Sequence, residues 1–284
     1  MSELIDSFLN QKRMNLVSKL YGDKVKDQLK NSFKLAFDDA LEGLDSRTSD
    51  LLDFINKLDN ISNIDESTKQ LYTIGNRKIH IVNTQKELNL AVELLFKSKV
   101  LGFDTEQKPV FQKGVPANGI SIIQLSDAKN SYIFQIKQIG NLTPLFDLLS
   151  SSKVLKIGIG LKGDISSMAS EFDVTLKACI DFGLIFKSKL YYENELGAKK
   201  SVLFFLDKKL QKSGRSSRSN WEIQKLSTSQ IRYASEDSSC VYDCFCMMLI
   251  KYPFLAEILP TWFKGRYHKN EYDEILEEFK LSLN

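Results

Sequence analysis

A short apolar run near the middle of the chain, Val100-Leu-Gly-Phe103, ends directly at the acidic triplet Asp104-Thr-Glu106. The run predicts a buried strand. Because residues i and i+2 of a strand point to the same face, the carboxylates of Asp104 and Glu106 would converge on one point. Carboxylates held this close repel each other, and a divalent cation removes the repulsion. The triplet is compatible with a metal site but does not predict one alone, because with 36 acidic residues in the chain such pairs arise by chance.

Other segments after residue 77 show strand and helix patterns. A capping box from Thr84 to Glu87 predicts one helix start. Thr143-Pro144 is typical of another, because proline in the first turn costs no hydrogen bond. Strands first and helices later, with one early crossover, predict an α/β fold in which helices flank a mixed central sheet. The predicted strands are residues 79–82, 100–103, 120–125, 132–134 and 154–157.

Residues 1–70 contain apolar residues at helical spacing and no proline, which predicts an N-terminal α-helical extension. Residues 1–78 carry 12 Lys/Arg and 13 Asp/Glu, so a basic nucleic-acid arm is not expected and a packing or protein-partner role is favoured. The expected organisation is a helical region at 1–70, a linker at 71–77, the main domain at 78–252 and a helical tail at 253–284.

The composition narrows the possible chemistry. The 284 residues are 43% hydrophobic and 26% charged, as in a soluble globular protein with a substantial core. Only two histidines occur, His80 and His268, so a histidine-based metal site or a Ser-His-Asp triad is hard to build. Hydrolytic chemistry would therefore rest on carboxylates. The four cysteines lack paired spacing, which indicates reduced thiols rather than disulfides or zinc ligands.

The sequence contains no run of 18 or more apolar residues, so no membrane partner is expected. The first residues also lack the apolar core of a secretory signal. These features predict an intracellular protein, in the nucleus or the cytoplasm, and leave a mitochondrial location open.

A third acidic position, Asp164, follows a glycine-rich turn. The strand predicted at 154–157 runs into Gly158, Gly160 and Gly163 before a helix begins. Two interpretations stay open: Asp164 caps the N-terminus of that helix, or the turn brings its carboxylate to the edge of the sheet. The spacing is not that of a P-loop, which would continue with Gly-Lys-Ser/Thr.

Tyr233 and Asp237 lie in a strongly helical stretch that follows Ser227-Thr228. At a spacing of i and i+4, the two side chains share one face of the helix. They are either parts of one site or a half-buried tyrosine beside a solvated aspartate. Glu236 is expected to face elsewhere.

Taken together, these segments resemble the three motifs of the DEDDy subgroup of DnaQ-like 3′→5′ exonucleases, similar above all to the exonuclease domain of Werner-syndrome helicases and more distantly to ribonuclease D. The resemblance covers residues 78–250. The matching positions are Asp104-Thr-Glu106, then Gly158, Gly160 and Asp164, then Ser219-Asn-Trp221 with Leu226, Gln230, Tyr233 and Asp237.

Two positions depart from that pattern. Gln107 stands where relatives often carry tryptophan, and Ser238 stands where alanine is common. Neither is one of the expected ligands, so the departures bear on substrate preference rather than on catalysis.

The resemblance implies that residues 78–252 form a ribonuclease H-like exonuclease domain that hydrolyses phosphodiester bonds with two metal ions. Mg²⁺ or Mn²⁺ would be held by Asp104, Glu106, Asp164 and Asp237. Tyr233 would orient the attacking water, because a phenol with a pKa of about 10 is a poor base at neutral pH. The implied partner is nucleic acid with a free 3′ end, with DNA favoured.

A basic segment supports a polyanionic substrate. Residues 187–232 carry 11 Lys/Arg and four Asp/Glu, a larger excess than the +3 of the whole chain. Beside the site, these cations would neutralise backbone phosphates; elsewhere they would form a solvated face. Trp221 would stack on a base or pack in the core. The candidate substrate contacts are Lys208, Lys209, Lys212, Arg215, Arg218 and Trp221.

Other functions stay open at this point. One is a 3′→5′ exoribonuclease in RNA processing. Another is a non-catalytic adaptor that binds nucleic acid or a protein partner. A metal-dependent hydrolase of small phosphates is disfavoured by the long basic segment.

Overall fold

The computed structural model describes Ser18 and residues 46–112, 114–116, 118–190, 195–212 and 214–283. The helices predicted within residues 1–45 lie outside this part of the chain, and a partner-binding role for them stays a prediction. Within the described residues, the helix α4 (Ser46–Asp59) agrees with the predicted N-terminal helical extension.

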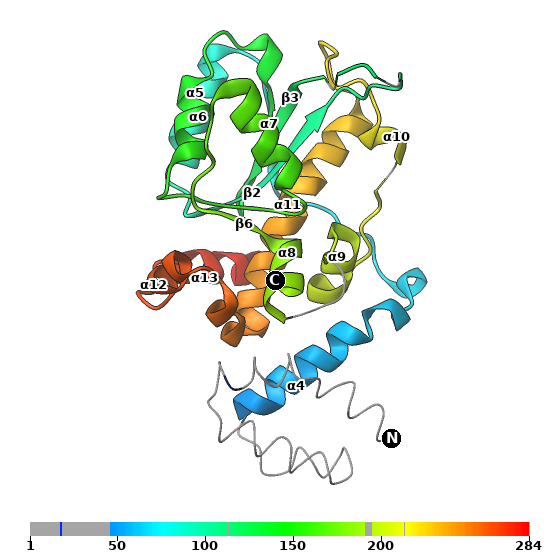
Figure 1. The fold of residues 1–284 in the computed structure, drawn as a ribbon, viewed down its shortest axis with the longest axis vertical. Helices are drawn as coiled ribbons and strands as arrows, with labels where there is room; N and C mark the ends of the chain where they lie inside the picture. Colours follow the sequence, from blue (N-terminus) through cyan, green and yellow to red (C-terminus); the bar gives the residue numbers. More distant parts are fainter. Residues whose placement is uncertain are drawn as a thin grey trace.

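The remaining elements follow in chain order, with short 3₁₀ helices between some of them (Figure 1). The strands are β1 (Lys78–Val82), β2 (Val100–Gln107), β3 (Ile120–Ser126), β4 (Asn130–Gln135), β5 (Leu155–Gly158) and β6 (Cys179–Asp181). The helices are α5 (Gln85–Leu95), α6 (Thr143–Ser150), α7 (Lys162–Phe172), α8 (Phe182–Leu190), α9 (Ala198–Leu206), α10 (Gly214–Ser217), α11 (Thr228–Lys251), α12 (Thr261–Tyr267) and α13 (Asp273–Ser282).

The strands form one mixed sheet in the order β1-β4-β3-β2-β5-β6. β3 pairs antiparallel with β2 and β4, whereas the β1–β4, β2–β5 and β5–β6 pairs are parallel. The predicted α/β architecture is therefore confirmed. β6 was not predicted, because its three residues are too few to show a strand period.

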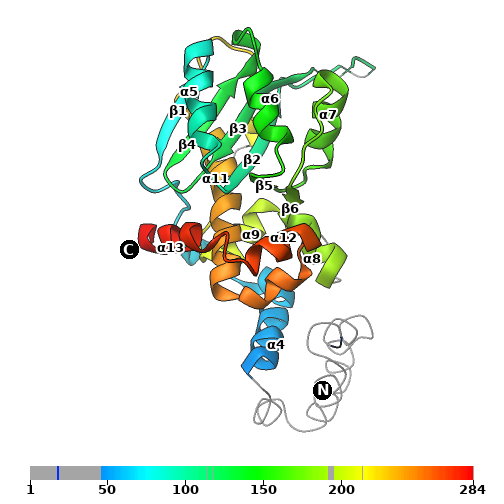
Figure 2. The same cartoon turned by 90° about the vertical axis from the view of Figure 1, so that its left-hand side faces the viewer.

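One face of the sheet packs against α5, α6 and α7 (Figure 2). The predicted capping box is present: the Thr84 hydroxyl accepts from the Glu87 amide, and the Glu87 carboxylate accepts from the Thr84 amide. Pro144 occupies the first turn of α6, as predicted. The shared core of this face consists of apolar side chains of the sheet, among them Leu101, Phe103, Ile123, Leu125 and Phe134.

The opposite face of the sheet is covered by α11 (Figure 2). The helix approaches β2 so closely that a Cβ added at Gly102 would lie 1.8 Å from the carbonyl oxygen of Ser238. Only glycine allows this approach. Beside it, the hydroxyl of Ser126 on β3 contacts the hydroxyls of Ser238 at 2.7 Å and of Ser239 at 3.0 Å. These contacts fix the position of α11 on the sheet.

The segment from α4 to β1 packs against the C-terminal half of α11. Phe54 of α4 is fully buried, and its ring centroid lies 4.8 Å from that of Tyr252. Within the predicted linker at 71–77, the Tyr72 hydroxyl donates to Asp243 at 2.6 Å, and Arg77 forms an ion pair with the same carboxylate. The ends of the linker and of the domains stay predictions.

The C-terminal residues form a helical tail of α12 and α13 beside α8 and α11 (Figure 2). All four cysteines are free thiols, and Cys240, Cys244 and Cys246 are buried in α11. Among the residues that the structure describes, no helix is long and apolar enough to span a lipid bilayer.

The contact at Gly102 gives a first prediction. Gly102→Ala should lower the free energy of unfolding by about 1–3 kcal/mol, because the added methyl group meets the α11 backbone and has no room to rotate away. Gly140→Ala is the matched control, since a Cβ there meets no atom within 4 Å. Urea unfolding of both variants measures the difference, and equal stability of the two would contradict the close approach of α11 to β2.

Candidate active site

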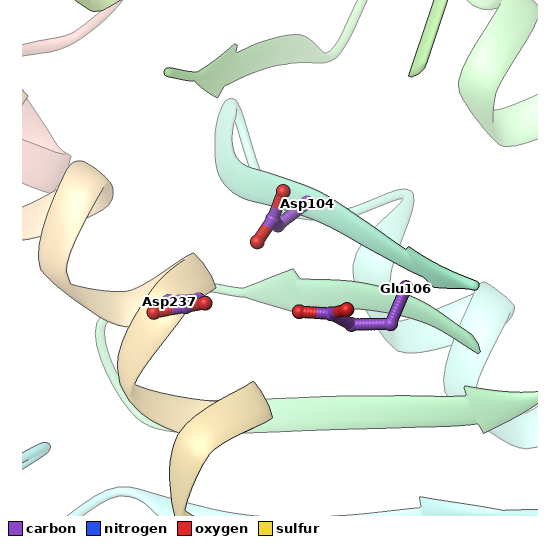
Figure 3. Close-up of side chains that lie close together, drawn as sticks. All are labelled: Asp104, Glu106 and Asp237. Carbon is purple, nitrogen blue, oxygen red and sulfur yellow. The ribbon is translucent and has the colours of Figure 1, made fainter. Parts of the chain in front are cut away.

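Three carboxylates meet where the C-terminal half of β2 faces α11 (Figure 3). Asp104 and Glu106 extend from β2 and Asp237 from α11, and ligand oxygens of the three residues lie within 4.8 Å of one another. Asp104 and Glu106 are partly buried, whereas Asp237 is only 6% exposed. The structure thus brings together two residues from one strand and one from a helix more than 130 positions later in the sequence.

Asp164 of α7 lies near this cluster but is not one of the three residues whose ligand oxygens lie within 4.8 Å of one another. Its carboxylate accepts a hydrogen bond from the hydroxyl of Thr105. Its negative charge raises the pKa of Asp104, after the larger contributions of burial and Asp237. The interpretation of Asp164 as an N-cap is wrong, because Leu161 occupies that position and Asp164 lies within the first turn. An acid in the first turn is favoured by the helix dipole.

The turn before α7 is held by Asp181, a residue that the sequence analysis did not single out. Its carboxylate accepts from the amides of Gly160 at 3.2 Å, Leu161 at 2.9 Å and Leu184 at 3.1 Å. Gly160 has a φ of +75°, which glycine adopts without strain. Asp181 therefore connects the turn before α7, and hence the placement of Asp164, to the end of β6.

Burial and mutual repulsion disfavour the charged forms of these acids. Burial, followed by the charges of Asp104 and Asp237, raises the pKa of Glu106 to about 9. Burial is also the main reason why the pKa values of Asp104, Asp164 and Asp237 lie above their usual range. A cluster of this kind gains strongly from a positive charge.

Lys212 supplies one such charge. Its ammonium lies 3.0 Å from Oδ1 of Asp237 and 5.7 Å from the ring centroid of Tyr233. Burial alone would lower the pKa of Lys212, but the charges of Asp237 and Asp104 outweigh it and raise the pKa. The lysine therefore stays protonated at the edge of the acidic cluster.

Tyr233 lies one helical turn before Asp237 and is only 9% exposed. Burial, followed by the charge of Asp237, raises the pKa of its phenol. At neutral pH the hydroxyl is therefore protonated and can donate a hydrogen bond. The ring packs against Trp221 at 6.0 Å between centroids. Trp221 is 1% exposed and packs in the core, which was one of the two places expected for it, and its contact with a substrate base stays a prediction.

Two cavities open at these residues. One, of about 600 Å³, is lined by Asp104 and Asp237 together with Lys199, Lys200 and Lys212. The other, of about 720 Å³, is lined by Tyr233, Glu236, Arg215 and Arg232 among others.

The basic residues that were predicted to contact the substrate therefore lie in different parts of the structure. Lys212 and Arg215 border the two cavities at the site, whereas Lys208 lines a different cavity, beside residues 73–78 and the C-terminal helix. Lys209 pairs through its backbone with residues 70–72, and the guanidinium of Arg218 donates to the Gly214 carbonyl. Lys199 and Lys200 belong to the predicted basic segment, but they were not among the predicted substrate contacts.

The donor set fits divalent cations that prefer oxygen ligands. The three clustered residues offer carboxylates only, which suits Mg²⁺ or Mn²⁺ and not a soft metal. Oδ2 of Asp237 is buried without a hydrogen-bond partner, so one ligand oxygen is uncommitted.

Comparison with known proteins places this site in a family. A family model described as a 3′-5′ exonuclease matches residues 79–249. A 3′-5′ exonuclease of Arabidopsis thaliana is 28% identical over 139 residues, 49% of this chain and 48% of that protein. The mouse bifunctional 3′-5′ exonuclease/ATP-dependent helicase WRN is 28% identical over 141 residues, 49% of this chain and 10% of that protein.

The chain thus spans about half the length of the Arabidopsis relative and a tenth of the mouse one. Among solved structures, Escherichia coli RNase D superposes with a TM-score of 0.56 and 19% identity over 67% of this chain and 49% of that chain. This similarity confirms the predicted ribonuclease H-like fold. On the strength of the family match, which covers β2 to β6, most of β1 and α11, and all the acids of the site, the chain belongs to the 3′-5′ exonuclease family.

Proposed function

We propose that this protein is a metal-dependent exonuclease that removes nucleotides from the 3′ end of a nucleic acid. The observation that carries the proposal is the meeting of Asp104, Glu106 and Asp237 within 4.8 Å. Family membership and the phenol of Tyr233 beside the cluster support it. Each of these residues lies in a segment that the family model matches.

Asp104, Glu106, Asp164 and Asp237 would hold two divalent cations, Mg²⁺ or Mn²⁺. The chemistry that such cations supply is activation of the attacking water and stabilisation of the leaving 3′ oxygen. Thr105 holds Asp164 through its hydroxyl. The side chains of Asp104 and Glu106 point to the same face of the sheet because the two residues lie two positions apart on β2.

Tyr233 is proposed to orient the attacking water. Its raised pKa keeps the phenol protonated, so it acts as a hydrogen-bond donor rather than as a base. Burial against Trp221 restricts the ring, which favours a fixed direction for the hydroxyl.

We propose DNA as the substrate, following the resemblance to Werner-type exonucleases. RNA is the alternative, and it is supported equally by the similarity to E. coli RNase D, whose structure is described as that of an exoribonuclease involved in structured RNA processing. The choice depends on how the pocket accommodates the ribose 2′-OH.

The central prediction concerns Asp104. The purified protein with Mg²⁺ or Mn²⁺ should shorten a 5′-labelled oligonucleotide one nucleotide at a time, and EDTA should stop it. Asp104→Asn should reduce the rate by more than about 100-fold, the upper range for loss of a residue that only supports a metal ligand. Asp147→Asn, which changes an exposed acid of α6, is the control and should retain activity.

Denaturing gels with matched DNA and RNA oligonucleotides, single- and double-stranded, give both the activity and the preferred substrate. Oligonucleotide binding without cleavage under any divalent ion would contradict the exonuclease proposal and favour a non-catalytic adaptor. Cleavage that survives in Asp104→Asn would disprove the proposed metal ligands.

A second prediction concerns pH. The pKa of Glu106 lies at about 9 against an ordinary value of 4.5, so the folded protein keeps a proton that the unfolded chain releases. The free energy of unfolding without divalent ions should therefore fall as the pH rises through this window. Because cations replace these protons, the rise in melting temperature on adding Mn²⁺ should be larger at pH 8 than at pH 6. Differential scanning fluorimetry measures it, and Glu106→Gln should reduce the pH dependence.

A third prediction tests the basic lining. Lys199 borders the cavity that contains Asp104, whereas Lys208 borders a different cavity. Lys199→Ala should weaken oligonucleotide binding and reduce the slope of log K against log salt by about 1. Lys208→Ala should change neither value. Fluorescence anisotropy titrations in Ca²⁺ at several salt concentrations compare the two, and equal slopes would remove the cavity from the substrate path.

A further inference from the structure

Gln124 is a buried amide beside the acidic cluster. The residue is fully inaccessible to solvent, and neither its Nε2 nor its Oε1 has a hydrogen-bond partner. A buried amide without partners costs about 1–3 kcal/mol of stability. An apolar side chain at this position would avoid that cost, so the amide calls for an explanation other than stability.

The pairing of β2 with β3 places Gln124 under the cluster. Gln124 lies directly opposite Asp104 in the antiparallel ladder, and Ile122 lies opposite Glu106. Opposite residues of such a pair direct their side chains to the same face. Gln124 therefore shares the face of the sheet from which both carboxylates of β2 project.

The same face is the one covered by α11. Two positions before Gln124, Ile122 packs in a cluster with Tyr233 and Ala234; two positions after it, Ser126 bonds the hydroxyls of Ser238 and Ser239. Gln124 thus lies under the turn of α11 between these contacts, which is the turn that carries Asp237.

Asp237 has an unused acceptor there. Its Oδ1 pairs with Lys212 at 3.0 Å, while its Oδ2 is buried and unpartnered. A donor without an acceptor on β3 and an acceptor without a donor on α11 therefore lie on the same side of the sheet. They are not bonded in the structure, and rotation of the Gln124 side chain is needed to bring them together.

We propose that Gln124 is a positioning residue of the metal site: its amide Nε2 donates to one lone pair of Asp237 Oδ2 and fixes the direction in which that oxygen presents its second lone pair to a divalent cation. The inference rests on the proposed function, because it concerns the same carboxylates. It adds a residue that acts through Asp237 and touches neither the substrate nor the reacting atoms.

Gln124→Met tests the proposal, since methionine has a similar length and no donor. Mn²⁺ affinity, measured by isothermal titration calorimetry on the folded protein, should fall by about 10- to 100-fold, as for other supporting residues of metal ligands. The melting temperature without metal should stay equal or rise. The Mn²⁺ concentration for half-maximal cleavage should increase by the same factor as the dissociation constant.

Gln135→Met is the matched control. Gln135 is also a buried glutamine of the sheet, but its Nε2 donates to the Ile223 carbonyl at 3.0 Å. Its replacement should lower the melting temperature and leave Mn²⁺ affinity unchanged. A structural role alone would therefore change stability, whereas a positioning role changes metal affinity.

Unchanged Mn²⁺ affinity in both Gln124→Met and Gln124→Leu would overturn the inference. If the wild-type protein still degrades oligonucleotides, the proposed function stands without it. If the wild-type protein binds Mn²⁺ but cleaves nothing, the proposed function fails, while the calorimetry still measures the effect of Gln124.

Discussion

The close contact of α11 with β2 is the constraint on which the site depends. Asp104 and Asp237 lie 133 positions apart in the sequence, and nothing local to either one brings them together. At Gly102, two positions before Asp104, the backbone of the helix fills the space that any side chain would occupy. One position after Asp237, Ser238 provides that backbone carbonyl and a hydroxyl bond to Ser126. The distance between the carboxylates is therefore set by a backbone contact, which is stiffer than a contact between side chains.

Contacts in the remainder of α11 offset the folding free energy that the acidic site costs. Gathering buried acids opposes folding, as the raised pKa values show, and Lys212 compensates only part of their charge. Further along the same helix, Asp243 is buried with Arg77 and Tyr72 as full partners. Paired in this way, a buried carboxylate holds the chain segment before β1 to the helix. The helix thus contains one acid satisfied by the protein and, less than two turns earlier, one left available for a ligand.

Local patterns in the sequence predicted the strands β1 to β5, the capping box at Thr84 and the shared directions of Asp104 with Glu106 and of Tyr233 with Asp237. These features depend on spacings of two or four residues, which a sequence displays directly. The assembly of the cluster was reached through resemblance to a family and not through spacing. Asp181, Gln124 and the Arg77–Asp243 pair were missed, because each acts through partners 20 to more than 160 positions away. Trp221 lies in a polar, basic stretch, and only the fold shows which of its two expected places it takes: it packs in the core.

The basic segment shows why a count of charges along the chain overstates what reaches a site. Six of its lysines and arginines border three different cavities. In the turn after α9, the backbone of Lys209 pairs with residues 70–72, and Lys208 and Lys212 border different cavities on either side of it. The cations that remain near the acids border two cavities, one reaching Asp104 and Asp237 and the other reaching Tyr233. A polyanion that occupies both would pass its backbone over the position where the carboxylates and the phenol meet. The packing of the chain around α11 therefore determines both where the acids lie and which of the many cations can act with them.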